Sequence, residues 1–413
     1  MVWTLIFPQL DKVAQLKDHS FSVKIKTVCI LHHIHIPSKL PPMWYPIKNP
    51  EEIDSPALLI YPERAKKNIQ TAIQVAGDVN RLRPHVKTHK MVEIAQMQLE
   101  AGITKFKCAT IAEAEMLAIA QAKDILLSYQ PIGPRADRLL ALAQAYPEIS
   151  FGCLLDDPNV AYQLSIKAKE TPITLKIWLD IDNGMQRSGI APGDGALALY
   201  GTIADLPGLE AAGLHVYDGH IRNPDFQKRI VDGDHAFTAV YTLIDRIEAA
   251  GLGKPNVVVG GSPSFPVNSL RANVDLSPGT FIFWDISYAN LCPELDFDFA
   301  AVVLTRILSK LGGKRICLDV GSKGVSPDHR VEDRIRFLNL ETQPTFIGQS
   351  EEHLVIEVDN PDDYAVGDVW YGVPFHVCPT VNLYQEAWLV PADQNSDVSE
   401  SWEVVARNRK ISF

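Results

Sequence analysis

Short apolar runs alternate with longer stretches in which apolar residues recur every three or four positions, from about residue 56 to residue 279. The short runs predict buried strands, and the longer stretches predict amphipathic helices that cover a sheet. Regular alternation of strands and helices is typical of a parallel sheet with helices outside it. The predicted strands of this series are 80–87, 105–110, 124–129, 150–156, 174–182, 209–217, 256–261 and 272–279.

Eight strands are the number that closes a barrel, so the predicted fold class is α/β, a (β/α)8 TIM-type barrel. After Gly279 the pattern changes to short strands without long helices, which predicts a C-terminal, mostly β domain. A further strand at 56–61 lies outside the count of eight and is assigned to the β domain. The expected organisation is a poorly ordered N-terminal extension at 1–42, a barrel at 62–280, and a β domain formed by 43–61 and 281–413.

Composition narrows the choice of partner and compartment. The formal net charge is −11, which argues against nucleic acid or an anionic membrane surface as a partner. Apolar runs fall short of the roughly 18 residues that a membrane span needs. The six cysteines are scattered without a CxxC pair, a pattern typical of a reducing compartment. We therefore expect a cytoplasmic protein that binds a small molecule.

Reactive and polar side chains follow several predicted strands. Lys87 ends the first strand, Arg187 follows the strand at 174–182, and Tyr217 ends the strand at 209–217. Active sites of such barrels lie at the C-terminal ends of the strands, so these side chains should meet. Lys90 is a rival to Lys87, but it begins the next helix.

Two small-residue loops, GGSPS at 260–264 and SPGT at 277–280, follow the last two strands and offer free backbone N–H groups for a phosphate. A lysine at a strand end beside them fits pyridoxal 5'-phosphate, with Lys87 as the Schiff-base lysine. Burial beside other cations should lower the pKa of that lysine. Arg83, two positions before His85 on the same strand, is expected to form a structural ion pair inside the barrel.

The motifs RPHVKTHK, DIDNGMQRSG, GLHVYDGH, GGSPS and SPGT resemble those of the alanine-racemase-type, fold type III pyridoxal-phosphate enzymes. The resemblance covers roughly 44–395 and is strongest to the branch of D-threonine aldolase and D-serine dehydratase. It implies that Lys87 binds the cofactor, that Tyr217 stacks on its ring and that Arg187 acts electrostatically. It also implies a dimer, and phosphate-loop roles for Gly261, Ser262, Gly279 and Thr280.

Ser277 departs from the racemase pattern, because racemases have an arginine there that touches the pyridine nitrogen. In the second domain, His376 and Cys378 are two residues apart and would point to one side of an extended segment. They fall where this branch has its divalent-metal ligands. Thiolate and imidazole favour zinc, whereas manganese or magnesium suits the aspartate that the aldolases carry. The resemblance also gives His353 a role in orienting the site or in proton transfer.

The sequence therefore predicts a lyase that acts on D-3-hydroxy amino acids with pyridoxal phosphate and a divalent metal. The preferred interpretation is D-threonine aldolase, which forms glycine and acetaldehyde, and the alternative is D-serine dehydratase. A racemase would need a second acid or base and no metal. A non-catalytic pyridoxal-phosphate carrier would have no use for the β domain with its His-x-Cys pair.

Overall fold

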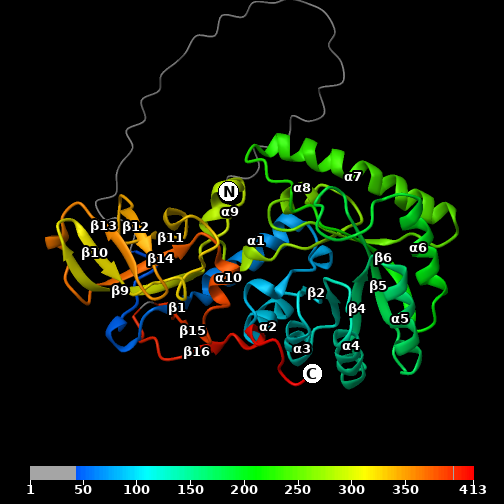
Figure 1. Ribbon diagram of the computed structural model, residues 1–413, viewed down its shortest axis with the longest axis horizontal. Coiled ribbons are helices and arrows are strands. Elements are labelled where there is room, and N and C mark those ends of the chain that lie inside the picture. Colours follow the sequence, from blue (N-terminus) through cyan, green and yellow to red (C-terminus); the bar gives the residue numbers. More distant parts are fainter. Residues whose placement is uncertain (1–42, 394) are drawn as a thin grey trace, which may run out of the picture. The chain divides into compact units, whose positions relative to one another are not determined.

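The computed structural model describes residues 43–393 and 395–413, so the predicted N-terminal extension at 1–42 lies outside the described residues. The described strands form two sheets (Figure 1), one with seven parallel strands and one mixed sheet with nine. None of the described helices is both long enough and apolar enough to cross a membrane.

The parallel sheet runs in chain order from β2 to β8, and helices follow its strands. Its strands are β2 (Lys105–Cys108), β3 (Asp124–Leu127), β4 (Ser150–Leu155), β5 (Leu175–Ile181), β6 (Leu209–Val216), β7 (Asn256–Val259) and β8 (Asp275–Leu276). The helices are α1 (Pro62–Ala76), α2 (Val92–Glu100), α3 (Ile111–Ile119), α4 (Pro134–Ala145), α5 (Pro158–Lys169), α6 (Asp194–Asp205), α7 (Phe226–Ala249) and α8 (Phe265–Ser269). The alternation in the sequence arises from this order of elements.

The segment predicted as the first barrel strand, 80–87, differs from the prediction. It forms isolated parallel bridges on both sides, from Leu82 to Leu276 on β8 and from His85 to Lys107 on β2. Pro84 has no N–H to donate, which shortens the ladder, although its carbonyl still accepts from the Lys107 N–H at 2.8 Å. The segment nevertheless links β8 to β2. The predicted barrel class is confirmed, with a first strand reduced to bridges.

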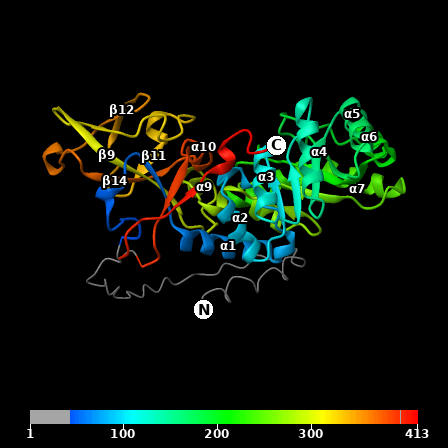
Figure 2. The ribbon, with the colours of Figure 1, turned by 90° about the horizontal axis from the view of Figure 1, so that it is seen from below.

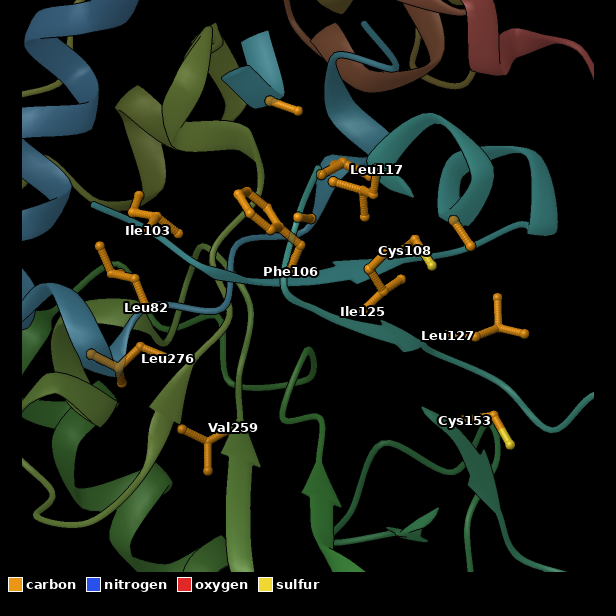
Figure 3. Close-up of a cluster of buried hydrophobic side chains, with 14 of the residues drawn as sticks. Leu82, Ile103, Phe106, Cys108, Leu117, Ile125, Leu127, Cys153, Val259 and Leu276 are labelled. Atoms are coloured by element: carbon orange, nitrogen blue, oxygen red, sulfur yellow. The ribbon is translucent and has the colours of Figure 1, made fainter. Parts of the chain in front are cut away.

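The main hydrophobic core lies between the barrel strands and their helices (Figure 3). Phe106 and Cys108 on β2 contribute to it, beside Leu117 of α3 and Ile125 of β3. Side chains alternate along a strand, so Lys107, between Phe106 and Cys108, points to the opposite face, the barrel interior. The interior of this barrel therefore carries polar groups such as Lys107 beside a small apolar cluster of Leu126, Leu154, Trp178, Ala212 and Val258.

The β domain contains the mixed sheet and two short helices, and it has no long helix among its described residues, as predicted after residue 279. Its elements are β1 (Ala57–Ile60), α9 (Ile286–Leu291), β9 (Ala301–Gly312), β10 (Arg315–Leu318), β11 (Ile335–Phe337), β12 (Thr345–Gln349), β13 (Leu354–Glu357), β14 (Val369–Pro374), α10 (Val377–Val381), β15 (Glu386–Leu389) and β16 (Ser401–Glu403). β1 pairs antiparallel with β9 and parallel with β15 (Figure 1). Figure 2 shows β9, β11, β12 and β14 of this sheet close together. The second sheet thus combines a strand that precedes the barrel with strands that follow it.

Candidate active site

Lys87 lies in a short 3-10 turn, Val86–Thr88, directly after the bridging segment. Its side chain is exposed, so the expected burial of this lysine is wrong. Lys87 lines a small pocket at the C-terminal ends of the barrel strands. The other residues around this pocket are His85, Lys107, Tyr217, Gly260, Gly261, Ser262, Ser277, Gly279, Thr280 and Tyr288. Five residues named from the sequence for cofactor binding, besides Lys87, therefore meet in one pocket.

Two cations near Lys87 in the sequence have structural partners. Lys90 is buried and its Nζ pairs with Glu113, which is the N-terminal acid of α3. Lys90 is not among the residues that line the pocket. Arg83 is buried and binds Asp124 at 2.5 Å and Asp275 at 3.2 Å, which confirms the predicted ion pair. The structure thus leaves Lys87 as the amine of this motif that faces the pocket.

The two small-residue loops converge on one oxygen atom. Backbone N–H groups of Gly279 and Thr280 both donate to the hydroxyl oxygen of Ser262, at 3.3 and 3.1 Å. A side chain at Gly279 would collide with the His85 carbonyl, since a Cβ there would lie 2.9 Å from it. Convergent N–H groups with room for close approach are what a phosphate oxygen requires. The residues present therefore fit the phosphate of pyridoxal phosphate.

Tyr217 and Arg187 lie together at the pocket rim. The guanidinium of Arg187 sits 4.5 Å from the centre of the Tyr217 ring and is exposed. Such a cation–aromatic contact orients both side chains and keeps a positive charge beside the pocket. The structure brings these two predicted residues together, although Arg187 is not among the lining residues.

Lys107 was missed by the reasoning from sequence. It is 2% exposed, lines the same pocket as Lys87, and its Nζ lies 3.4 Å from Nε2 of His215. Burial, and then the nearby charge of Lys87, lower the pKa of Lys107 to about 7. The available signal was the alternation of Lys105 and Lys107 with apolar residues, which places both lysines inside the barrel.

His376 and Cys378 lie beside the pocket at the start of α10. The two residues are not on one extended segment, as predicted, because His376 caps the helix and Cys378 lies in its first turn. Nδ1 of His376 donates to Asp328 at 2.5 Å, and the interaction with Cys378 raises the pKa of the histidine. Donor atoms of Asp328, His329 and His376 lie within 4.8 Å of one another. The sequence reasoning named neither Asp328 nor His329 as a ligand.

Charges in this cluster suit a cation. Burial would lower the pKa of His376, but Cys378 and Asp328 outweigh it and raise the pKa to about 9. Burial would likewise raise the pKa of Cys378, yet the hydrogen bond and charge of His376 lower it overall. Each group thus stabilises the charged form of the other, and a metal ion would take the place of the histidine proton. Imidazole nitrogen, thiolate and carboxylate together are the donor types of a zinc site, so the residues present fit a divalent metal.

Cys378, a candidate metal donor, contacts the candidate cofactor pocket. The Thr88 hydroxyl lies 3.1 Å from the Cys378 sulfur, and Thr88 follows Lys87 in the chain. The hydroxyl of Thr280, from the phosphate loop, lies 3.6 Å from the same sulfur. By contrast, His353 is exposed in the turn between β12 and β13 and is not among the pocket residues. The barrel and the β domain thus contribute to one site.

Comparisons with known proteins agree with this arrangement. Residues 60–285 match the alanine racemase N-terminal domain family, and 300–390 match the serine dehydratase domain. The 3-hydroxy-D-aspartate aldolase of Paracoccus denitrificans is 29% identical, over 87% of this chain and 93% of its own. The D-threo-3-hydroxyaspartate dehydratase of Delftia sp. is 25% identical, over 85% and 97%. The solved D-threonine aldolase of Filomicrobium marinum is 28% identical, with a TM-score of 0.79 over 86% of this chain and 96% of its own.

A barrel with a pocket at its strand ends, followed by a mostly β domain, places the chain in a class of amino-acid lyases on the fold of the alanine racemases. These relatives are aldolases and a dehydratase. The chain belongs to the alanine racemase N-terminal domain family, in the branch that holds D-threonine aldolase and the serine dehydratase domain. The predicted resemblance and the prediction of a lyase are confirmed.

Proposed function

We propose that the protein is a pyridoxal-phosphate and divalent-metal-dependent lyase of D-3-hydroxy amino acids. The proposed reaction is the cleavage of D-threonine-like substrates to glycine and an aldehyde. The contact between Thr88 and Cys378 carries this proposal, because it joins the metal donors to the residue beside Lys87. A metal held by Cys378 would lie near Lys87, the amine that would bind the cofactor. A racemase or a carrier has no need of such an arrangement.

Residues of the barrel hold the cofactor in this proposal. Lys87 provides the amine for the covalent linkage, and Tyr217 and Arg187 border the ring. The backbone N–H groups of Gly279 and Thr280, which donate to the Ser262 hydroxyl here, would bind the phosphate. When bound, pyridoxal phosphate supplies an electron sink for the negative charge that develops at Cα.

Residues of the β domain bind the substrate's hydroxyl side through the metal. His376 and Cys378 are the proposed ligands, and Asp328 accepts from Nδ1 of His376 and so directs Nε2 outward. A metal with two protein ligands keeps open positions and acts there as a Lewis acid for the β-hydroxyl. The thiolate of Cys378 favours zinc over manganese or magnesium.

Dehydration is the second candidate, and Cys378 favours it. Solved structures of the Delftia dehydratase include a histidine variant and a cysteine variant two positions apart, and the cysteine variant is in a metal-free form. The same spacing and residue types occur here as His376 and Cys378. In this alternative, D-serine or D-threo-3-hydroxyaspartate first loses water, and a water molecule then hydrolyses the resulting imine to a keto acid and ammonia. Three of the similar curated proteins are named aldolases, and for this reason cleavage remains the preferred reaction in this proposal.

One experiment separates these reactions. Protein loaded with pyridoxal phosphate and zinc is incubated with D-threonine, D-serine or D-threo-3-hydroxyaspartate, with L-threonine as the stereochemical control. Glycine with an equal amount of aldehyde supports cleavage, whereas keto acid with ammonia and no glycine supports dehydration. Chelation should abolish turnover while the cofactor stays bound. Full turnover without metal, or conversion of D- to L-amino acid alone, would overturn the proposal.

A further inference from the structure

Lys107 is a second amine in the cofactor pocket, and the function proposed above does not use it. It lies on β2, 2% exposed, and lines the pocket with Lys87 and Tyr217. Its Nζ is 5.9 Å from the centre of the Tyr217 ring. A buried amine is costly unless it is hydrogen-bonded, so its partners indicate what it can do.

Asp180, His215 and Lys107 form a hydrogen-bonded chain in the barrel interior. Oδ1 of Asp180 lies 2.7 Å from Nδ1 of His215, and a carboxylate only accepts, so Nδ1 carries the proton. Nε2 of His215 therefore has a lone pair, and it accepts from Nζ of Lys107 at 3.4 Å. A protonated lysine has three N–H groups, which leaves two for the pocket.

Two other polar side chains of the pocket already use their hydrogen-bonding groups. The Ser277 hydroxyl donates to the carbonyl of Arg83 at 2.8 Å. In His85, Nδ1 accepts from a backbone N–H at 3.3 Å, and Nε2 lies 3.3 Å from the Ser128 hydroxyl. That hydroxyl donates to a backbone carbonyl on β2, so Nε2 is the donor to its oxygen. Lys107, in contrast, keeps donors for a ligand.

The charge of Lys107 responds to its surroundings. Burial and then the charge of Lys87 lower its pKa to about 7, Asp180 and Asp218 oppose this effect, and Arg187 adds to it. The amine can therefore gain or lose its proton near neutral pH. A phosphorylated cofactor brings negative charge into the pocket, which favours the protonated form. The bound state thus places an ammonium group against the cofactor.

Given the cofactor assigned under the proposed function, we infer that Lys107 is a catalytic residue that donates a hydrogen bond from Nζ to an acceptor on the cofactor ring. The acceptor is the pyridine nitrogen or the phenolate oxygen. Lys87 remains the covalent amine. Asp180 and His215 are positioning residues, because they hold the Lys107 amine in one orientation. Through this bond Lys107 sets how strongly the ring withdraws electrons from the substrate.

The test compares Lys107→Met with Lys105→Met. Lys105 is the matched control, because it lies two residues away on the same face of β2 and pairs with Asp275. Each holoprotein is titrated with pH in the visible absorbance band, and 15N spectra are recorded with pyridoxal phosphate labelled at its ring nitrogen. Borohydride reduction and peptide mapping identify the lysine that carries the cofactor.

In Lys107→Met the borohydride-reduced cofactor should still be attached to Lys87. The pH midpoint of the absorbance should differ by about one unit or more from that of wild type and from that of Lys105→Met. Cofactor binding should weaken about tenfold, the loss of one charge-assisted hydrogen bond. A shifted 15N resonance identifies the pyridine nitrogen, and an unshifted one identifies the phenolate oxygen. The inference would be overturned if the spectra of Lys107→Met equal those of wild type and Lys105→Met. It would also be overturned if the reduced cofactor of the wild-type protein is attached to Lys107.

Two further outcomes keep the experiment decisive. If wild-type protein takes up no borohydride-reducible cofactor, the proposed function fails together with this inference. If circular dichroism shows that Lys107→Met is unfolded, Lys107→Arg and Lys107→Gln replace it. The arginine variant keeps the charge and should stay close to the wild-type spectrum, whereas the glutamine variant should show the shift. Equal spectra for these two variants would also overturn the inference.

Discussion

Replacing Asp328 by asparagine should weaken metal binding through His376. The aspartate accepts from Ser326 through Oδ1 and from Nδ1 of His376 through Oδ2. In Asp328→Asn the amide oxygen can still accept from Ser326, which turns the amide N–H towards Nδ1. The imidazole proton then moves to Nε2, the nitrogen that would bind the metal. Removal of such a histidine partner typically costs about 10- to 100-fold in metal affinity, or roughly 1.4–2.8 kcal/mol.

The loss should depend on pH in a defined direction. The pKa of His376 is raised to about 9 without metal, in part by Asp328, so protons compete with the metal at neutral pH. Asp328→Asn lowers that pKa and relieves this competition, which offsets part of the lost affinity at pH 7. At pH 9.5, where His376 is mostly neutral in both proteins, the full loss should appear.

The assay is a titration of metal-free protein with zinc in the presence of a competing chelator, at both pH values. Asp333→Asn is the control, since Asp333 belongs to the same loop region and lies outside the three-residue donor cluster. An affinity of Asp328→Asn equal to that of wild type at pH 9.5 would refute the reasoning. A larger loss at pH 7 than at pH 9.5 would also contradict it.

Three further substitutions test the pocket. Lys87→Ala should abolish the visible absorbance and the borohydride label of bound cofactor, and a yellow, reducible variant would contradict this. Lys90→Ala should keep the visible absorbance and the borohydride label. Its free energy of unfolding in urea should fall by about 3–5 kcal/mol, because Glu113 is left buried without its ion-pair partner. An unchanged free energy of unfolding would be the contrary result. Gly279→Ala places a Cβ 2.9 Å from the His85 carbonyl and should weaken cofactor binding at least tenfold in equilibrium titrations, with unaltered affinity as the refuting outcome.

Periodicity and strand-end residues were sufficient to predict the barrel and the meeting of its two small-residue loops at one pocket. These features depend on local order in the chain, which the sequence displays directly. The segment 80–87 was predicted as a regular strand, but Pro84 interrupts its hydrogen-bond ladder. Isolated bridges on either side still hold the segment in place. The effect of a proline depends on which neighbours remain to pair, and that is a tertiary property.

The polar groups that sequence reasoning missed come from distant parts of the chain. Lys107 looks like an ordinary charged residue in a short strand until His215, far along the sequence, is placed at its Nζ. Nothing in the local sequence distinguishes Asp328 from other acidic residues, and only the fold shows that it hydrogen-bonds Nδ1 of His376. Burial and partner choice decide the roles of such residues, and neither is encoded in local spacing.

β1 has a consequence for how the chain is made. Leu59 pairs with Val302 on one side and with Trp388 on the other, and the whole strand is buried. The first partner leaves the ribosome roughly 240 residues after Leu59, a wait of roughly 12–50 s at about 5–20 residues per second. Throughout that time the nascent chain carries an apolar strand with both edges open, beside a barrel that is still being completed. Folding of this enzyme during synthesis therefore depends on shielding β1. A chain released early, from a ribosome that stalls within the β domain, would expose the edges of β1 and be prone to pair with another chain.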